Sequence, residues 1–239
     1  MTGPRCIGID GCPAGWVAAT PEGVFLERQL SDLLCSGGLI PGSDIVAIDM
    51  PIGLARAGRR ECDVLARQEL GAARRNSVFL TATRGAVQAD SHTEATRLNR
   101  ANNAKGVSAQ AYHLFGKIRE VDELLAVNPA LQTTLYEVHP ELAFACWNAD
   151  ANGALRPMPH PKKSGLGAYD RLRLVFKRYG RDHFERFRQR HWSSHVADDD
   201  IADAYAALFA AERIAAGLHR ALPEHPPRDE RGLPMRICF

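Results

Sequence analysis

Two short apolar segments that each end in an aspartate restrict the possible folds of this chain more than any other feature. The first is CIGID at residues 6–10, and the second is DIVAID at residues 44–49. The second run is too short for a helix and is apolar on both faces, which is typical of a buried central strand. Strand ends meet at the edge of an α/β sheet, where ligands commonly bind, so we expect Asp10 and Asp49 to share one site.

The N-terminal strand begins a predicted antiparallel meander. Turn residues at 11–15 lead into a second apolar run at 16–19, and the turn PEG at 21–23 leads into a third strand at 24–26. Residues 31–35 then have the pattern of a short helix.

Most of the remaining chain has either helical periodicity or loop composition. A further strand at 135–138 contains Glu137, and His139-Pro140 marks the start of the next helix. Residues 72–90 are rich in Arg, Thr and Gly and are expected to form a structured loop. Apolar residues recur at helical spacing over 59–70, 108–127, 169–179 and 199–218, and a charged segment at 182–190 extends the third of these.

Length and composition favour a single domain. The chain has 239 residues, of which 45% are apolar and 24% are charged, as in ordinary globular proteins. We therefore expect one domain over residues 1–239, with a helical insertion at roughly 55–130 and a Pro-rich C-terminal tail at 223–239 that wraps the surface.

Several classes of protein are not supported by the sequence. The six cysteines are scattered without a Cys-x-x-Cys pair, so we interpret them as reduced thiols rather than as zinc ligands. Neither a Walker phosphate loop nor a dinucleotide-binding fingerprint occurs. Without a signal-peptide pattern or a membrane-spanning apolar run, a cytoplasmic location without membrane contact is expected. The net charge of +2 neither supports nor excludes nucleic acid as a partner.

Acidic side chains on the last predicted helix can complete the site of Asp10 and Asp49. Asp200 and Asp203 are three residues apart, so both carboxylates project from one face of that helix. A group of such carboxylates is usually neutralised by a hard divalent cation, which makes Mg²⁺ or Mn²⁺ the expected cofactor. A pair of these ions catalyses phosphodiester hydrolysis without a His or Cys nucleophile.

Each acid also has a purely structural interpretation. Asp10 precedes Gly11 and could be a turn residue. Asp49 lies before Met50-Pro51 and could serve merely to terminate its strand. Asp198 and Asp199, in the first turn of the last helix, are better explained as caps. Capping explains Asp203 least well, because it lies deeper within an otherwise apolar and Ala-rich segment.

Other polar residues are candidates for the walls of the same site. Glu137 could contribute a further carboxylate or face solvent from an edge strand, and His139 could line the pocket or bond nearby backbone. Phosphate could be bound by basic side chains that are otherwise solvated surface: Arg74, Arg75, Arg84, Lys162 and Lys163.

Three blocks of sequence resemble a known family. They are IGIDGCPAGW at 7–16, IDMPIGL at 48–54 and EVHPE at 137–141, which are similar to the signature blocks of domain-of-unknown-function family 429, a family of predicted nucleases. Further matches are RRNSVF at 74–79, which contains Ser77, SAQA at 108–111 and KKSG at 162–165. The similar blocks run from Ile7 to the last helix and thus cover nearly the whole chain.

The resemblance implies a ribonuclease H-like α/β fold, in which an antiparallel three-strand meander and parallel strands form one mixed sheet flanked by helices. Within that fold Asp10 resembles the first-strand aspartate, and either Asp49 or Glu137 resembles the second acid. Asp200 and Asp203 resemble the final-helix acids of Holliday-junction resolvases. Because this fold also hosts sugar kinases and ATPases, activity has to be argued from the site.

The expected function is a divalent-metal-dependent, nuclease-like phosphodiester hydrolase acting on nucleic acid or a nucleotide-like phosphate. One alternative is a phosphotransferase or other small-phosphate hydrolase on the same fold, and another is a non-catalytic ligand-binding or regulatory module. The catalytic candidates are Asp10, Asp49, Glu137, Asp200 and Asp203, of which all but Glu137 are the metal candidates. The substrate-binding candidates are Arg74, Arg75, Ser77, His139, Lys162 and Lys163. The sequence leaves the oligomeric state open.

Overall fold

The N-terminal strands form the antiparallel meander that the sequence predicts. The structure is a computed structural model that describes residues 3–239 except 37–38, 40 and 104. Strand β1 (Cys6–Cys12) pairs with β2 (Gly15–Thr20), and β2 pairs with β3 (Gly23–Glu27), both in antiparallel orientation.

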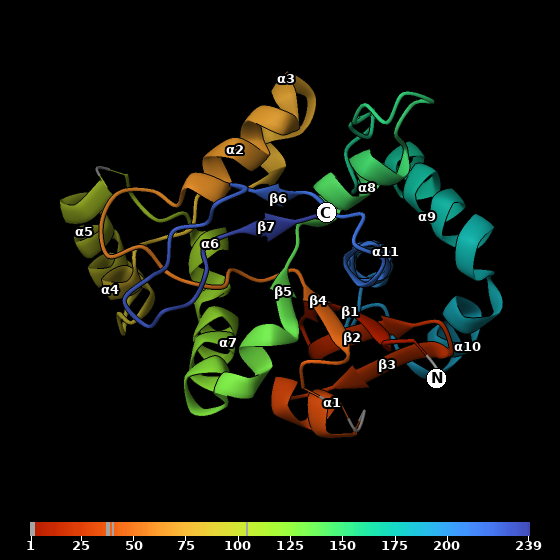
Figure 1. The fold of residues 1–239 in the computed structure, drawn as a ribbon, viewed down its shortest axis with the longest axis horizontal. Coiled ribbons are helices and arrows are strands. Elements are labelled where there is room, and N and C mark those ends of the chain that lie inside the picture. The colour runs from red at the N-terminus through yellow and green to blue at the C-terminus, as the bar shows by residue number, and fades with distance from the viewer. Residues whose placement is uncertain (1–2, 37–38, 40, 104) are drawn as a thin grey trace.

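Two later strands extend this meander into one mixed sheet. Strand β4 (Ile45–Ile48) pairs with β1, and β5 (Leu135–Glu137) pairs with β4, both in parallel orientation. Within the described residues the sheet has five strands in the order β3-β2-β1-β4-β5 (Figure 1). The predicted α/β class with a mixed sheet is therefore confirmed.

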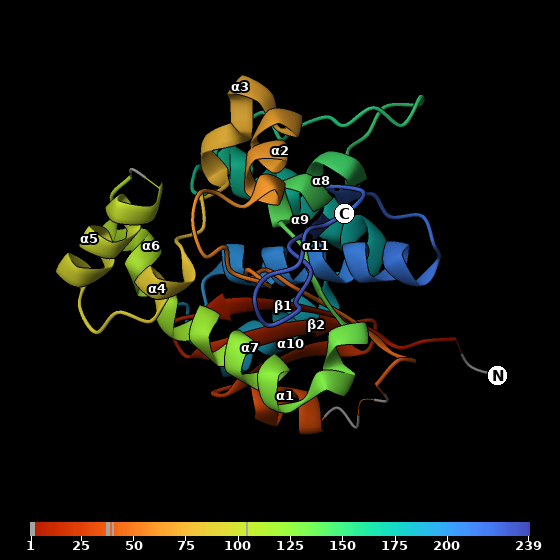
Figure 2. The same ribbon diagram turned by 60° about the vertical axis from the view of Figure 1, so that its left-hand side comes forward.

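Helices cover both faces of the sheet (Figure 2). On one face, α1 (Leu30–Ser36) and α7 (Phe115–Val127) pack against strand residues such as Ile9 and Ile48. On the other face, α11 (Asp198–Ala215) packs against β1, β2 and β4, where Val17 and Ala47 join its buried apolar residues. Side chains alternate between the faces of a strand, which explains why neighbouring residues of one strand belong to different clusters.

Gly8 allows α11 to approach the sheet at backbone distance. A Cβ atom at this position would lie 1.9 Å from the backbone nitrogen of Leu208 and 2.2 Å from the carbonyl oxygen of Ala204. Only a glycine fits such an approach. The contact fixes the height of α11 over β1, and so determines which residue of α11 lies above the end of that strand.

The segment between β4 and β5 is helical. It contains α2 (Glu61–Glu69), α3 (Gly71–Arg74), η1 (Arg75–Ser77), α4 (Arg84–Val87), α5 (His92–Asn103), α6 (Ala109–His113) and α7, followed by η2 (Pro129–Thr133). The prediction of a loop at 72–90 was therefore wrong in part, because three short helical turns lie there. The single helix predicted at 108–127 is interrupted at Leu114, whose N–H bonds to the carbonyl of Ala111 only three residues back. The boundaries of the predicted insertion stay a prediction.

After β5 the chain forms α8 (Pro140–Trp147), α9 (Gly165–Tyr179), α10 (Asp182–Arg190) and α11. The C-terminal tail forms a small antiparallel pair, β6 (Ala221–Leu222) and β7 (Ile237–Cys238). Its prediction as a surface wrap was wrong at the end, because Ile237, Cys238 and Phe239 are all buried. Ile237 and Phe239 pack among apolar residues of α2 and α8. None of the helices in the described part of the chain is long and apolar enough to cross a membrane.

Candidate metal centre

Strand register places Asp10 beside Asp49. In the parallel ladder of β1 and β4, Ile9 pairs with Ile48, and the N–H of Asp49 donates to the carbonyl of Ile9 at 2.9 Å. Asp10 follows Ile9 and Asp49 follows Ile48, so the two aspartates lie side by side at the ends of the paired segments. Because Ile9 and Ile48 pack on the face of α1 and α7, the two aspartates project toward the face of α11.

Helix α11 contributes the third acid, Asp203, which precedes the Ala204 carbonyl that lies against Gly8. One carboxylate oxygen from each of Asp10, Asp49 and Asp203 can be chosen so that all three lie within 4.8 Å of one another. The two strand ends and the last helix thus converge as their sequence patterns indicate. We call this group the acidic site.

The acidic site contains a carboxylate oxygen that lacks a hydrogen bond. Asp203 is 3% exposed, and its Oδ1 is buried and accepts no hydrogen bond from any described residue. Asp10 has one partner, because its Oδ1 accepts from the N–H of Gly11 at 2.7 Å. A buried polar atom without a partner is costly, and a divalent cation held by the three carboxylates would remove that cost. The chemistry of the residues present therefore fits a hard metal ion.

Mutual repulsion and burial disfavour the charged forms of these acids. Burial raises the pKa of Asp10, and the charges of Asp49 and Asp203 raise it further. Burial and the charge of Asp203 raise the pKa of Asp49 to about 8. The pKa of Asp203 is raised to about 6 by burial, against the lowering effect of Lys162. Such groups ionise together only with added positive charge.

Lys162 supplies part of that positive charge. Its Nζ lies 2.7 Å from Asp203 Oδ2 and 3.3 Å from Asp199 Oδ2. Burial alone would lower its pKa, but the charges of Asp203, Asp10 and Asp199 outweigh burial and raise it. The ammonium therefore compensates one of the three carboxylates and leaves the other two for a cation or a substrate-bound metal.

Asp200 lies on the wall of the site and acts first as a cap. Its Oδ2 accepts a hydrogen bond of 3.0 Å from the N–H of Ala197, the residue before α11. It lines the same pocket as the acidic site but is outside the group of three close oxygens. The structure therefore places one of the two predicted final-helix acids, Asp203, in the centre of the site.

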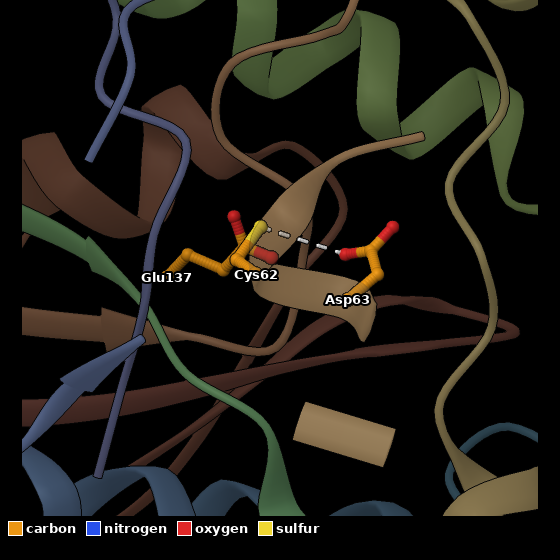
Figure 3. A group of neighbouring side chains, drawn as sticks. All are labelled: Cys62, Asp63 and Glu137. Carbon is orange, nitrogen blue, oxygen red and sulfur yellow. Dashed lines mark hydrogen bonds between the residues drawn. The ribbon is translucent and has the colours of Figure 1, made fainter. Parts of the chain in front are cut away.

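Glu137 lines the same pocket as the acidic site, but its carboxylate belongs to a second cluster. Glu137 pairs with Ile48 in the ladder of β4 and β5, so its side chain points to the face opposite Asp49. Its carboxylate accepts hydrogen bonds from the buried guanidinium of Arg60 and from the N–H of Ile52. Figure 3 shows Glu137 beside Cys62 and Asp63, whose thiol and carboxylate are 3.7 Å apart.

Arg60 supplies positive charge to this second cluster. It is 1% exposed and forms ion pairs with both Glu137 and Asp63, the latter at 3.2 Å. Burial raises the pKa of Glu137 to about 7, while Arg60 lowers it. We therefore interpret the group of Cys62, Asp63 and Glu137 as a structural ion cluster and not as a second metal centre.

Glu141 is an acid of the pocket that sequence reasoning missed. It lies in the first turn of α8 and lines the pocket, and its charge raises the pKa values of both Asp49 and Asp203. Its Oε1 pairs with Arg171 at 2.5 Å, while its Oε2 is buried without a hydrogen bond to the described residues. The available signal was the EVHPE block, whose two glutamates both line the pocket and both raise the pKa of Asp49.

The acidic site forms the floor of a pocket of about 640 Å³. Ser77 and Lys163 line this pocket, as does Arg74, whose Nε donates to the carbonyl of Met158 at 2.7 Å. His139 also lines it, but its Nδ1 accepts from the N–H of Glu141, and burial lowers its pKa. His139 is therefore a neutral cap of α8.

Two of the predicted phosphate ligands lie elsewhere. Arg84 is buried and forms ion pairs with Asp122 at 2.6 Å and Asp229 at 2.5 Å, so it ties α4 to α7 and the C-terminal tail. Arg75 lines a neighbouring pocket of about 430 Å³ instead of the acidic one.

Comparison with known proteins gives one match. The model of a family described as "Protein of unknown function (DUF429)" matches residues 8–228, a range that contains Asp10, Asp49, Glu141 and Asp203. No curated protein and no solved structure matches the chain.

Proposed function

The chain belongs to the DUF429 family, and from the chemistry of its acidic site we propose that it is a divalent-metal-dependent phosphodiester hydrolase. One observation carries this proposal. Asp10, Asp49 and Asp203 bring carboxylate oxygens within 4.8 Å of one another, and an oxygen of Asp203 has no hydrogen bond to the described residues. An all-oxygen donor set of this kind suits Mg²⁺ or Mn²⁺.

Asp10, Asp49 and Asp203 would hold the ion, and Glu141 adds negative charge behind them. Such an ion would lower the pKa of a water molecule and would offset negative charge on phosphoryl oxygens. Rigid elements hold the first two aspartates at strand ends and the third on a helix fixed by Gly8. Pre-positioned ligands of this kind need no rearrangement during the reaction.

The basic residues of the pocket would orient the substrate. Lys162 is held at the acidic site by Asp203 and Asp199, so its ammonium can donate to a phosphoryl or leaving oxygen there. Arg74 and Lys163 line the same pocket and add positive charge at its wall. These groups support phosphate as the substrate, since carboxylates alone would repel an anion.

Metal binding is the first test of this function. Calorimetric titration with Mn²⁺ is expected to show saturable binding by the wild-type protein and at least about tenfold weaker binding by Asp10→Asn and Asp203→Asn. Asp182→Asn, an exposed aspartate at the start of α10, is the matched control and should bind like the wild type. Circular dichroism checks that each variant is folded.

Hydrolysis is the second test. Wild-type protein with Mn²⁺ is expected to cleave a fluorescent oligonucleotide, and the two site variants are expected to lose this activity. A folded wild-type protein that binds no Mn²⁺ would contradict the proposal and favour a ligand-binding module. Binding without cleavage of any phosphodiester would restrict the protein to a metal-dependent binding function.

A further inference from the structure

A second pocket, lined by basic residues, lies next to the acidic one. It has a volume of about 430 Å³, and its lining includes four cationic side chains and no acid: Arg59, Arg67, Arg75 and Lys105. We call it the basic pocket. Arg59 and Arg75 are exposed and form no ion pair with any described residue. The positive charge of this lining attracts anions such as phosphates.

The two pockets share a wall. Asn76 and Leu80 line both of them, so residues 76–80 separate the acidic site from the basic pocket. We call this segment the ridge. Arg67 fixes it to α2, because its guanidinium donates to the carbonyl of Val78 at 2.6 Å and to Asn76 Oδ1 at 3.0 Å. Helices α2 and α3, which carry the basic pocket, lie beside α8 in both views of the fold (Figures 1 and 2).

An exposed aromatic side chain lies on the ridge. Phe79 is 41% exposed and lines the acidic pocket, whereas its neighbour Val78 is 2% exposed and packs into the core. A large apolar side chain in such a position has no role in the core. Aromatic rings beside cationic grooves are the usual platform on which bases of single-stranded nucleic acid stack.

We infer that the substrate is single-stranded nucleic acid, whose backbone crosses the ridge with one base on Phe79 and neighbouring phosphates in the basic pocket. The choice of a phosphodiester at the acidic site rests on the proposed function. A ligand that also contacts Phe79 and the basic pocket must be a polymer, because a mononucleotide at the acidic site would reach only one side of the ridge. Duplex is disfavoured, because its stacked bases cannot cover Phe79.

Binding can be measured apart from cleavage. A fluorescein-labelled single-stranded oligonucleotide is titrated with protein in EDTA at several salt concentrations, and fluorescence anisotropy gives the dissociation constant. The double variant Arg59→Gln/Arg75→Gln is expected to weaken binding and to reduce the slope of log affinity against log salt by about 1.4, for two lost phosphate contacts. The control is Arg173→Gln/Lys177→Gln, which removes two exposed charges from α9 outside both pockets and should keep the slope.

Phe79→Ala tests the stacking platform. It is expected to weaken single-strand binding on the order of tenfold without changing the salt slope, since it removes stacking but no charge. Phe25→Ala, which removes another exposed phenylalanine on β3, should bind like the wild type. A duplex of the same sequence is expected to bind more weakly than the single strand.

The outcomes separate this inference from the proposed function. Wild-type binding that depends on Arg59, Arg75 and Phe79, without any cleavage in Mn²⁺, supports the inference and removes the hydrolase. Cleavage in Mn²⁺ with unchanged binding by these variants supports the hydrolase and overturns the inference. Absence of saturable single-strand binding, equal affinity for duplex, or full competition by inorganic phosphate would also overturn it.

Discussion

Lys162 connects the acidic site to the loop before α9 through its contacts with Asp203 and Asp199. The ammonium and a divalent cation are attracted by the same carboxylates. Each therefore weakens the binding of the other, although both can be present while a phosphate lies between them. The metal-free protein consequently has a built-in partial substitute for the ion.

Replacement of Lys162 by Met is expected to tighten Mn²⁺ binding by about tenfold, because a positive charge within a few ångströms of the site is removed. The same variant is expected to lose hydrolytic activity, since the donor to substrate oxygens is lost. Calorimetry and an oligonucleotide cleavage assay measure the two effects. Lys163→Met provides the control for metal affinity, because Lys163 is exposed and pairs with no described acid. Weaker Mn²⁺ binding by Lys162→Met would show that the lysine does not compete with the ion.

Glu137 and Glu141 allow a matched comparison of two glutamates from one sequence block. Glu137→Gln is expected to lower the free energy of unfolding by about 3 kcal/mol, because it breaks a buried ion pair with Arg60. Its effect on Mn²⁺ affinity should be smaller than that of Glu141→Gln, because the charge of Glu137 acts on Asp49, whereas that of Glu141 acts on both Asp49 and Asp203.

Glu141→Gln is expected to weaken Mn²⁺ binding several-fold, because its charge acts on both Asp49 and Asp203. Urea denaturation and calorimetry on both variants give the comparison. A larger loss of metal affinity in Glu137→Gln than in Glu141→Gln would place the fourth acid where the sequence first suggested it.

The sequence predicted the meeting of Asp10 and Asp49 because each ends an apolar strand, and parallel strand ends meet at one edge. It also predicted Glu137 at the wall of the pocket, which Glu137 lines, but it did not show that this carboxylate pairs with Arg60 instead of joining the three aspartates. Glu137 is one residue out of step with Asp49, since it pairs with Ile48. Whether residues of two neighbouring strands point to the same face of the sheet depends on the strand register, which a single sequence does not specify.

At the scale of elements, the contact of α11 with β1 decides where Asp203 lies. Gly8→Ala is expected to lower the free energy of unfolding by at least about 2 kcal/mol, because its Cβ would overlap backbone atoms of α11 that cannot rotate away. Shifting α11 also moves Asp203, so Mn²⁺ affinity should fall in the same variant.

Gly116 in α7 provides the control for this substitution. A Cβ there meets no other atom within 4 Å, so Gly116→Ala is expected to leave stability unchanged or to raise it by up to about 1 kcal/mol. Urea denaturation measures both variants. Equal stability of Gly8→Ala and the wild type would mean that α11 is not held at the backbone distance described here.

Elements with strong periodicity were predicted well, while their interruptions were not. The strands of the meander and the last helix follow directly from alternating or helical apolar patterns. The break at Leu114 leaves that pattern intact, because the apolar stripe continues through it from α6 into α7. The buried end of the tail was missed for a related reason, since three residues after a Pro-rich stretch are too few to show a period.

At the scale of the whole molecule, buried acids with raised pKa values make stability depend on pH. Asp49 has a pKa of about 8, Glu137 of about 7 and Asp203 of about 6 in the folded chain, all above the values near 4 expected when unfolded. Between about pH 4 and pH 8 these groups therefore bind more protons in the folded state than in the unfolded state. Without metal, the contribution of these three groups to stability is therefore fully present below about pH 4 and is lost as the pH rises to about 8.

The melting temperature in EDTA is expected to decrease between about pH 5 and pH 8. Each proton that the folded state binds in excess of the unfolded state lowers the free energy of unfolding by at most about 1.4 kcal/mol per pH unit. Asp49→Asn should flatten the upper part of this curve, because Asp49, with a pKa of about 8, is the last of these three groups to lose its proton. Mn²⁺ binds the deprotonated carboxylates, so the stabilisation that it provides should grow over the same pH range. Differential scanning fluorimetry with and without Mn²⁺ tests both trends. A stability in EDTA that rises through this range would mean that Asp49 and Asp203 are ionised and compensated without metal, and the acidic site would then have no need of a cation.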